Sequence, residues 1–352
     1  MENTRYQTED LIDFATTVLC STGLAKDRST IIAKALLESD LMGHTTHGLH
    51  LLLGYTDDLS SGQMSKEGNP IVLNDSGSAI AWHGNFLPGP YLMHQALQLG
   101  FDRIQDHPTF TLTIQQGHHI ACLAAYLEKA TQRDLMIILS SSDPRNKTVA
   151  PFGGLTGTHS PNPISYGIPT EGMPILFDSS TSTVANGVIV QKRRQGEDLD
   201  GEWMLGPDGT ATASTEAYFA ENPATVLPVG GMDLGFKGFG WGILIEALTN
   251  GLGGYGRRNN VKRWISSINL QLIDPAQFGG KDAFKGEMQH LVNACKASDT
   301  RPGFSEVRLP GERALKKKQE HLANGVWLHP GVLTVMQQCA EKYNVKMPVP
   351  IK

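Results

Sequence analysis

The sequence has no excess of basic residues and no long hydrophobic run. Its 352 residues include 30 Lys and Arg against 35 Asp and Glu, which gives a formal net charge of −5. Proteins that bind nucleic acid neutralise phosphates with clustered Lys and Arg, so this balance gives nucleic-acid binding no electrostatic support. Apolar runs such as Leu135–Leu139 are far shorter than the ~20 residues that span a bilayer. We therefore expect neither nucleic acid nor a membrane as a partner.

Cysteine is scarce, and the N-terminal residues lack the basic and then apolar pattern of a secretion signal. The four cysteines, Cys20, Cys122, Cys295 and Cys339, lie far apart and form no CxxC pair. This spacing is typical of separate thiols in a reducing compartment rather than of a disulfide framework. Hydrophobic residues make up 40% of the chain and charged residues 18%, which suits a globular protein. We expect a soluble cytoplasmic protein with two domains or one large one.

The usual nucleotide-binding motifs are missing. The single GxGxxG match, Gly251–Gly256, follows a predicted helix and precedes a basic, polar stretch. A dinucleotide-binding loop would instead follow a strand and open a helix, because the pyrophosphate binds at the helix N-terminus. We interpret the match as a glycine cluster at the C-terminal end of a helix. Since no Walker-type phosphate loop is present either, any nucleotide would bind at an unconventional site.

The middle of the chain alternates between short strand-like segments and amphipathic helices. The strand-like segments are rich in apolar residues and are bounded by Gly, Pro, Asn and Ser. This alternation predicts an α/β core with a mainly or partly parallel sheet. The predicted strands are Ile71–Asn74, Ala79–His83, Phe110–Ile114, Leu135–Ser140 and Pro174–Asp178, and the predicted helices between them are Tyr91–Gln105 and Ile120–Gln132.

The first sixty residues predict helices only. One helix begins at Thr8 or Asp10, either of which can cap it. A second begins after Asp27 and stops at Gly43, and a third covers Leu49–Leu59. The N-terminal part of the chain is therefore expected to pack as a small group of helices.

The rest of the chain gives four further predictions. Residues 191–224 are polar, and we expect a solvated excursion with no chemical role. Residues 230–252 predict a glycine-rich entry into an apolar helix. The tail begins with a strand-like patch at Phe304 and continues as a basic helix whose lysines 316–318 are expected to face solvent. A last helix is predicted over 329–343.

A turn with two histidines, two threonines and two glycines, Gly43–Gly48, follows the second helix. A histidine beside a hydroxyl at the end of an element is a suitable proton donor, because its free pKa of about 6.5 allows proton exchange near neutrality. We expect this role for His47, next to Thr46, and a structural role for His44. As an alternative, His44 and His47 could bind a metal, with Asp40 as the only nearby carboxylate.

Further loops rich in Gly, Ser, Thr and Asn lie at strand or helix ends. Small polar residues at such ends supply hydroxyls and free N–H groups, which can hold phosphates and carboxylates. Any one of these loops is a weak signal, whereas all of them in this order form a specific pattern. They contain Gly117–His119, Ser140–Asp143, Pro151–Gly154 with Asn162–Ile164, Asp178–Ser182, and Gly230–Gly231 followed by Lys237–Gly240.

The order of these motifs, from Glu38–Gly48 through Arg308–Glu312 to Gly325-Val326, resembles the malate/L-lactate dehydrogenase family. That family includes ureidoglycolate dehydrogenase, sulfolactate dehydrogenase, diketogulonate reductase and the piperideine-2-carboxylate reductases. The resemblance implies an α/β fold in which a mixed sheet with flanking helices binds NAD or NADP without a Rossmann motif. A helical portion made from the N- and C-terminal residues would complete the fold.

The same resemblance implies a division into domains and an activity. Residues 76–304 would form the NAD(P)-binding domain, and residues 1–75 with 305–352 would form the helical part with catalytic and dimer contacts. The activity implied is hydride transfer between nicotinamide and a 2-hydroxy acid/2-oxo acid pair or a cyclic imine acid. The chain would act as a homodimer on a small-molecule substrate.

The resemblance also assigns roles to residues at matching positions. His47 would donate the proton, and Thr46 and Asp178 would orient it. His119 would be either a second acid/base residue or a packing residue at the cofactor, and no metal is expected. The positions implied for the substrate are His47, Asn162 and Lys237, and those implied for the cofactor are His119, Ser140, Asp178, Ser179, Ser180, Lys237, Gly238, Arg308, Gly311 and Glu312.

Two positions depart from the family pattern. Many relatives carry an arginine at position 51, where it would bind the substrate carboxylate, and a histidine at position 236. This sequence has Leu51 and Phe236, so we expect a bulkier or less acidic 2-oxo compound than malate or lactate. Two alternatives stay open: a nucleotide-binding paralogue that has lost its activity, and a metal-dependent hydrolase that uses His44 and His47.

Overall fold

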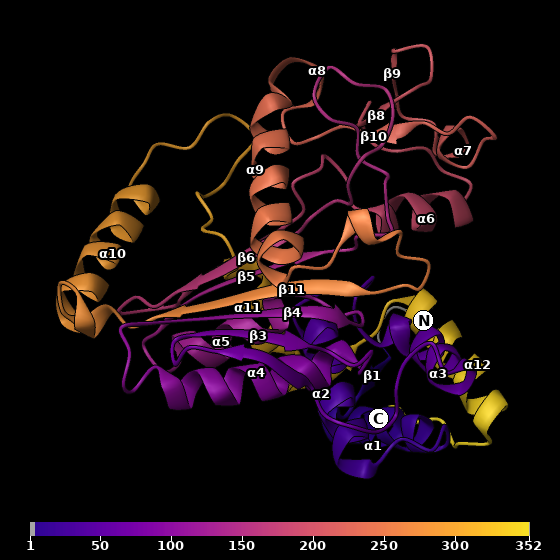
Figure 1. The fold of residues 1–352 in the computed structure, drawn as a ribbon, viewed down its shortest axis with the longest axis horizontal. Helices are drawn as coiled ribbons and strands as arrows, with labels where there is room; N and C mark the ends of the chain where they lie inside the picture. The colour runs from indigo at the N-terminus through magenta and orange to yellow at the C-terminus, as the bar shows by residue number, and fades with distance from the viewer. Residues whose placement is uncertain (1–3, 352) are drawn as a thin grey trace.

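The computed structural model describes residues 4–351, and its centre is a seven-stranded mixed sheet (Figure 1). Within this sheet β3 and β4 pair in parallel and the other neighbours are antiparallel, which confirms the predicted class but makes the sheet only partly parallel. In spatial order the strands are β2 (Ile71–Asp75), β3 (Ala79–His83), β4 (Thr109–Gly117), β11 (Ser266–Ile273), β5 (Met136–Ser142), β6 (Ile164–Ile168) and β7 (Ile175–Ser179).

One face of the sheet is apolar and is covered by two helices, α4 (Gly89–Arg103) and α5 (Ala124–Thr131). Ile268 on β11 lies opposite Ile114 on β4, and both side chains are fully buried in this core. Figure 1 shows α4 and α5 on one side of the strands, whereas α9 (Phe236–Glu246) stands on the other. Burial of apolar side chains between the strands and these helices therefore holds the sheet in place.

The opposite face of the sheet is polar, because successive side chains along a strand point to opposite sides. Asn269 on β11 lies across from Thr113 on β4 and Ser140 on β5, and all three are buried. Within residues 4–351, the Ser140 hydroxyl and the Asn269 amide nitrogen have no hydrogen-bond partner. These polar positions explain why the sequence does not predict β11 as a strand.

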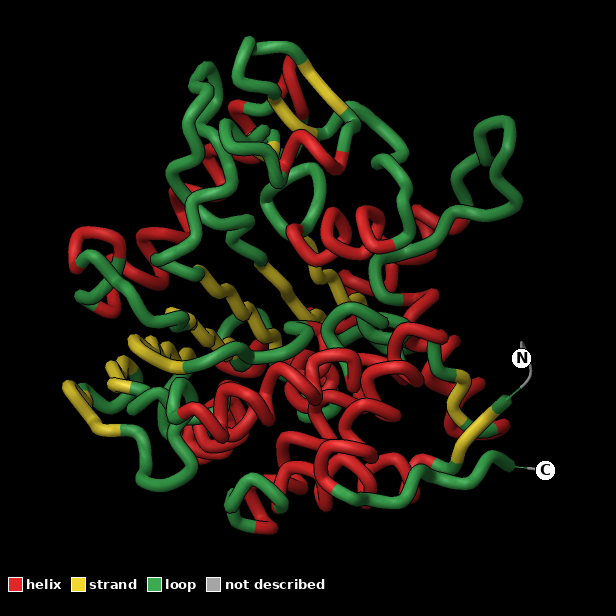
Figure 2. Tube along the Cα trace, turned by 90° about the vertical axis from the view of Figure 1, so that its right-hand side faces the viewer, coloured by secondary structure: helices red, strands yellow, loops and turns green. Residues whose placement is uncertain are grey.

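The helices from the two ends of the chain form a second core beside the sheet, which confirms the predicted helical portion. The strand pair β1 with β12, and a hydrogen bond of 2.8 Å from Ile351 N–H to Arg5 O, bring the two ends together (Figure 2). The elements of this part are β1 (Arg5–Tyr6), α1 (Thr8–Cys20), α2 (Lys26–Leu41), η1 (Leu49–Leu51), α3 (Leu52–Ser61), α11 (Glu312–Asn324), β12 (Val326–Trp327) and α12 (Pro330–Tyr343).

The polar residues 191–224 are not the solvated excursion expected from their composition. They contribute Leu199, Met204 and Ala224, all buried, to a third, smaller core. The apolar residues of this segment are too widely spaced to show a period in the sequence, and they meet only in the folded chain. The elements here are α6 (Asn186–Arg194), β8 (Met204–Leu205), β9 (Ala211–Thr212), α7 (Thr215–Tyr218) and β10 (Thr225–Val226).

Three local predictions meet different outcomes. The glycines at 251–256 follow a helix end, as expected, whereas no strand forms at Phe304. Lys318 does not face solvent, because it pairs with Glu38 on α2 at 2.5 Å and with Glu128 on α5 at 2.6 Å. The remaining elements are α8 (Gly231–Leu234), the π-helical turn η2 (Ala247–Gly251), η3 (Arg257–Asn259), η4 (Pro275–Gln277) and α10 (Lys281–Lys296).

The predicted domain boundaries near residues 75 and 305 stay a prediction. The strand β2 ends at Asp75 and pairs with β3 on the other side of the first boundary. Met42, after α2, and Leu315, on α11, belong to the same core as the sheet. The terminal helices and the sheet are therefore packed against each other over a shared apolar core.

Candidate active site

The histidine turn, residues 43–48, is held from beneath by a buried carboxylate. Asp40 is 3% exposed, and its Oδ2 accepts a hydrogen bond of 2.7 Å from Leu49 N–H, at the start of η1. A Cβ atom at Gly48 would lie 2.2 Å from this oxygen, so only glycine fits over the carboxylate. Burial raises the pKa of Asp40 to about 7, against the Leu49 hydrogen bond and the Lys317 charge. Asp40 thus fixes the backbone that carries the histidines.

His47 has one ring nitrogen engaged and one free. Its Nδ1 lies 2.8 Å from Thr46 Oγ1, and among residues 4–351 its Nε2 forms no hydrogen bond. Burial lowers the pKa of His47, the Asp178 carboxylate opposes this shift, and the neighbouring His44 and His50 add to it. At neutral pH the imidazole is therefore uncharged and able to accept a proton.

His119 stacks on His47, with ring centroids 5.7 Å apart and 22° between the planes. Ala121 N–H donates to His119 Nδ1 at 3.1 Å, so the proton of the neutral ring lies on Nε2. The Tyr55 hydroxyl lies 3.1 Å from the same nitrogen and donates to the His119 carbonyl at 2.7 Å. Burial, followed by His47 and His118, keeps the pKa of His119 well below its usual value. This geometry favours a fixed N–H donor over an acid/base residue.

Asp178 lies on β7, one residue before its end. Its Oδ2 accepts hydrogen bonds from Ala124 N–H at 2.8 Å and from the Cys122 thiol at 3.2 Å. Among residues 4–351 no hydrogen bond joins Asp178 to His47, so the carboxylate acts on the imidazole through its charge, which raises the pKa of His47. Burial also lowers the pKa of His44, and Asp178 again opposes the shift. Asp178 therefore favours the imidazolium form without fixing the tautomer.

Two cavities open beside the histidine turn. We call the first the arginine cavity, which has a volume of about 520 Å³, and the second the tryptophan cavity, which has a volume of about 630 Å³. His47 itself lines neither cavity, but its ring stacks on His119 of the second and the charge of Asp178 in the first acts on its pKa. The arginine cavity is lined by His44, Asp178, Arg308, Gly311 and Arg313 among others, and the tryptophan cavity by Leu51, Tyr55, His119, Arg145, Lys262 and Trp264 among others.

Three positions implied for the cofactor, Asp178, Arg308 and Gly311, come together in the arginine cavity. Gly311 has a φ of 84°, and a Cβ atom there would lie 2.6 Å from Leu176 O on β7. Leu176 N–H also donates to Pro310 O at 3.1 Å. The loop that carries Arg308 is therefore packed directly on the strand that carries Asp178.

Two other sets of implied cofactor positions are occupied by contacts within the chain. Glu312 begins α11 and pairs with Lys296 and with Lys316, and hydrogen bonds from these lysines lower its pKa to about 2. The hydroxyls of Ser179 and Ser180 donate to backbone carbonyls one and two residues further on, each at 3.0 Å. These residues shape the loops beside the arginine cavity.

Lys237 and Gly238 are not brought to the residues around His47. Lys237 is exposed on α9, and its Nζ lies 6.0 Å from the centroid of the Phe236 ring. Gly238 is buried where α9 packs on a neighbouring loop. The helix α9 stands on the polar face of the sheet (Figure 1), so neither residue lines the two cavities.

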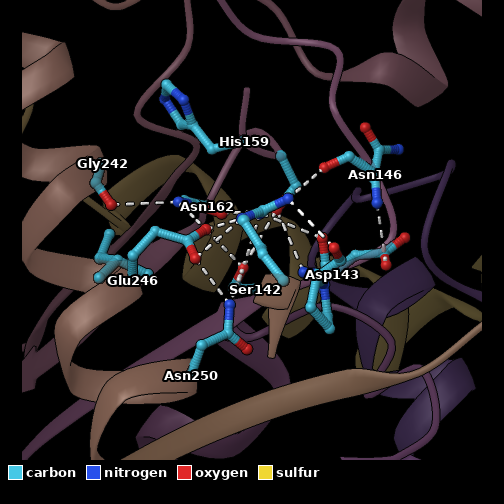
Figure 3. A network of polar contacts seen from close by, with 12 residues as sticks. Ser142, Asp143, Asn146, His159, Asn162, Gly242, Glu246 and Asn250 are labelled. Atoms are coloured by element: carbon cyan, nitrogen blue, oxygen red, sulfur yellow. Dashed lines mark hydrogen bonds and ion pairs between the residues drawn. The ribbon is translucent and has the colours of Figure 1, made fainter. Parts of the chain in front are cut away.

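Asn162 lies in a buried polar network beneath the loops (Figure 3). Its Nδ2 donates to Gly242 O at 3.1 Å and to Glu246 Oε1 at 2.9 Å, and its Oδ1 accepts from the Ser160 hydroxyl at 2.5 Å. Glu246 pairs with Arg257 at 2.6 Å. The amide of Asn162 is therefore occupied within the protein and has no free group for a substrate.

Several residues that line the tryptophan cavity are not identified from the sequence. Tyr55 lies seven residues after Gly48, which corresponds to about two helical turns. In the helix predicted after the turn, this spacing indicates that Tyr55 returns to the side of the histidines. Arg145, Lys262 and Trp264 lie on loops remote from the histidine turn in the sequence. No periodicity or motif marks them, so only the folded chain shows where they belong.

The sequence profile of the malate/L-lactate dehydrogenase family matches residues 6–337. The chain belongs to this family. A malate dehydrogenase of Pyrococcus abyssi is 26% identical over 97% of this chain and 96% of its own length. A Delta(1)-pyrroline-2-carboxylate reductase of Ancylobacter novellus is 27% identical over 91% and 92%. The crystal structure of malate dehydrogenase from Entamoeba histolytica, 19% identical, has the same fold, with a TM-score of 0.89 over 99% of this chain and 100% of that one.

Membership makes this chain a dehydrogenase, and so an oxidoreductase, of the malate/L-lactate dehydrogenase family. Across residues 4–351, no group of three or more His, Cys, Asp and Glu could hold a metal ion, so the pair His44 and His47 is not joined by further ligands. None of the helices described is long and apolar enough to cross a membrane.

The protonation of Asp40 predicts a pH dependence of stability. Because burial raises its pKa to about 7, the folded protein keeps a proton that the unfolded chain releases near pH 3.8. This contribution to the free energy of unfolding is fully present below that pH and is lost as the pH rises through 7. Asp40→Asn retains an acceptor for Leu49 N–H, and we expect it to flatten this decline in urea unfolding measured across the interval. A decline as steep as that of the wild type would contradict the assignment.

Proposed function

We propose that this chain transfers a hydride between NAD or NADP and a 2-hydroxy acid/2-oxo acid pair or a cyclic imine acid. The relatives include malate and L-lactate dehydrogenases and a pyrroline-2-carboxylate reductase, so their names cover both substrate classes. The observation that carries the proposal is an uncharged histidine, His47, which has one nitrogen held by Thr46 and whose ring stacks on His119 of the tryptophan cavity, while Asp178 of the arginine cavity acts on its pKa. Such a residue can exchange a proton with a substrate in one cavity while a cofactor binds in the other.

We place the nicotinamide dinucleotide of this proposal in the arginine cavity. Its volume of about 520 Å³ lies within the ~300–1,000 Å³ range of ligand sites. Arg308 and Arg313 line it, and within residues 4–351 neither forms an ion pair. Guanidinium groups without a carboxylate partner suit phosphate oxygens, which they can bind through two parallel hydrogen bonds. When bound, the nicotinamide gives or takes the hydride.

The proton is handled by residues of the chain itself. In the oxidation of a hydroxy acid, neutral His47 keeps its own proton on Nδ1, where it is donated to Thr46 Oγ1, and accepts the hydroxyl proton at Nε2; the charge of Asp178 stabilises the imidazolium that forms. His119, whose Nε2 carries its proton, donates a hydrogen bond to the substrate oxygen. In the reverse reaction His47 returns the proton to the same oxygen, or to the imine nitrogen.

We also propose that the chain acts as a homodimer in the cytoplasm. The helix α9 is apolar yet exposed, with Phe236 51%, Trp241 55% and Ile243 51% accessible. Exposed apolar surface of this kind marks an interface, and a twofold symmetric pair lets one such helix cover another. The four cysteines form no disulfide, which suits a reducing compartment.

The first test measures turnover directly. Consumption of NADH and NADPH is followed with a panel of 2-oxo acids and cyclic imine acids. We expect His47→Asn to lower kcat by on the order of 10²–10⁴-fold, because proton transfer is lost. Cofactor affinity, followed by tryptophan fluorescence, should not change.

The matched control for this test is His290→Asn, which replaces an exposed histidine on α10. This variant should retain full turnover. Retained turnover in His47→Asn would remove His47 from the mechanism. Cofactor binding by the wild type without turnover of any panel member would instead favour the paralogue that has lost its activity.

Asp178→Asn tests the charge beside His47. In the pH profile for oxidation, kcat/KM decreases toward low pH, because His47 gains a proton and can no longer act as a base. Burial lowers the pKa of His47, so we expect this decrease below the usual histidine pKa of about 6.5. Removing the carboxylate charge should lower the pKa of His47 further and so move the decrease in kcat/KM to still lower pH. Reduction should slow more than oxidation, because reduction needs the protonated form of His47. Asparagine keeps an acceptor for Ala124 N–H. A pH profile equal to that of the wild type would show that the charge has no such role.

The proposed dimer predicts the effect of a charge on α9. We expect Trp241→Lys to shift the chain from dimer to monomer in analytical ultracentrifugation, because a lysine cannot be buried without a partner. The control is Val349→Lys, since Val349 is 62% exposed near the C-terminal end, away from α9. A Trp241→Lys protein that stays a dimer would show that the interface lies elsewhere.

A further inference from the structure

Two basic side chains on two different loops, Arg145 and Lys262, line the tryptophan cavity, and both are exposed. Across residues 4–351 neither side chain forms an ion pair with a carboxylate. The only carboxylate that lines the cavity, Asp58, lies 3.4 Å from His118 Nε2 instead. Unpaired cations that face the same cavity are suited to an anionic ligand.

The other ionisable groups of the cavity offset these charges only in part. Burial lowers the pKa of His50, and that of His118 to about 3, so both rings are neutral near pH 7. Burial and the nearby Asp57 raise the pKa of Asp58, whereas Arg263 and Arg145 oppose this rise. With two basic side chains, Arg145 and Lys262, against the one carboxylate of Asp58, the lining of the cavity has an excess of positive charge.

The loop that carries Arg145 is fixed by the buried network of Figure 3. Arg257 donates to Asp143 O at 3.2 Å and to Asn146 O at 2.6 Å, on either side of Arg145. Asp143 Oδ1 accepts the Arg145 N–H at 2.9 Å. Arg257 is itself held by Glu246 at 2.6 Å. The position of Arg145 on this loop is thus set before any ligand binds.

The second loop is fixed from its other side. Arg263, next to Lys262, donates to Gln63 O and Gly62 O, each at 2.8 Å. Its guanidinium also lies 3.8 Å from the centroid of the Phe86 ring. The following residue, Trp264, lies 5.3 Å from the His119 ring, centroid to centroid. This loop therefore places a cation and an aromatic ring beside the histidine that is proposed to bind the substrate oxygen.

We propose that Arg145 and Lys262 together bind the carboxylate of the substrate, and that the apolar surface of Leu51 and Trp264 contacts its side chain. An arginine fork and a lysine ammonium suit a carboxylate, whereas Leu51 offers no charge to a second acidic group. The substrate class is accordingly a 2-oxo monocarboxylate with an apolar or aromatic side chain. The assigned substrate class rests on the proposed function, whereas the binding of an anion by Arg145 and Lys262 does not depend on it.

The test uses oxamate, an amide analogue of a small 2-oxo acid that cannot be reduced as a ketone. Its affinity is measured by calorimetry, with and without saturating NADH or NADPH, for the wild type and three variants. Arg145→Gln should weaken binding by on the order of tenfold to a hundredfold, as expected for the loss of a charged hydrogen bond. Lys262→Gln should weaken it less, and Arg145→Lys should restore part of the loss.

Arg258→Gln is the matched control, because Arg258 is exposed in the same segment as Lys262 and does not line either cavity. It should bind oxamate like the wild type, and thermal melts of all variants should coincide. Oxamate that binds Arg145→Gln and Lys262→Gln as tightly as the wild type would overturn the proposal. A wild-type protein that does not bind oxamate under either condition would also overturn it.

Failure of this inference is distinguishable from failure of the proposed function. If oxamate binding depends on Arg145 but no 2-oxo acid or imine is reduced, the anion site stands and the proposed reaction is wrong. If the panel is turned over with an unchanged KM in Arg145→Gln and Lys262→Gln, the reaction stands and the anion site is wrong. A panel in which 2-oxo dicarboxylates are preferred would contradict the assigned substrate class.

Discussion

A partly buried ion pair joins the central sheet to the loops of the tryptophan cavity. Glu246 on α9 accepts hydrogen bonds from Ser142 at the end of β5, from Asn162 and from Arg257, and Arg257 in turn holds the loop at 143–146. Charges withdrawn from water are tolerated only when their remaining lone pairs and protons are satisfied. Here both carboxylate oxygens have two or more donors, so one arrangement of helix, strand and loops is strongly preferred.

Burial, rather than ion pairing, sets the chemistry of the histidines. His47, His118 and His119 lose solvent where the terminal helices meet the sheet, and each has a lowered pKa for that reason. The three rings are distinguished by their surroundings: a hydroxyl contacts His47, a backbone N–H donates to His119, and within residues 4–351 neither nitrogen of His118 has a hydrogen-bond partner. One region of low polarity can thus hold a proton acceptor and a fixed hydrogen-bond donor side by side.

Much of the architecture could be predicted from the sequence, because apolar segments with clear boundaries form most of the sheet. The strand β11 could not, since Asn269 and the serines at its start hide its alternation. At the proposed site, His47, Asp178 and Arg308 could be named from the sequence, because the order of their motifs along the chain is typical of the family and hence of its fold. Arg145 and Lys262 are single charged residues on loops, and no local pattern tells which cavity a loop will border. Lys237 shows the opposite case: its motif could be recognised in the sequence, but the motif does not tell where α9 lies relative to the two cavities.

The close fit between Asp40 and Gly48 has a consequence for how the sequence can change. With no room for a Cβ atom at position 48 while the carboxylate lies beneath it, the tolerance of one position depends on the residue at the other. Substitutions at the two sites should therefore be strongly non-additive, as expected for residues in direct contact. A side chain at position 48 therefore requires a smaller or displaced residue at position 40, so we expect the two positions to change together.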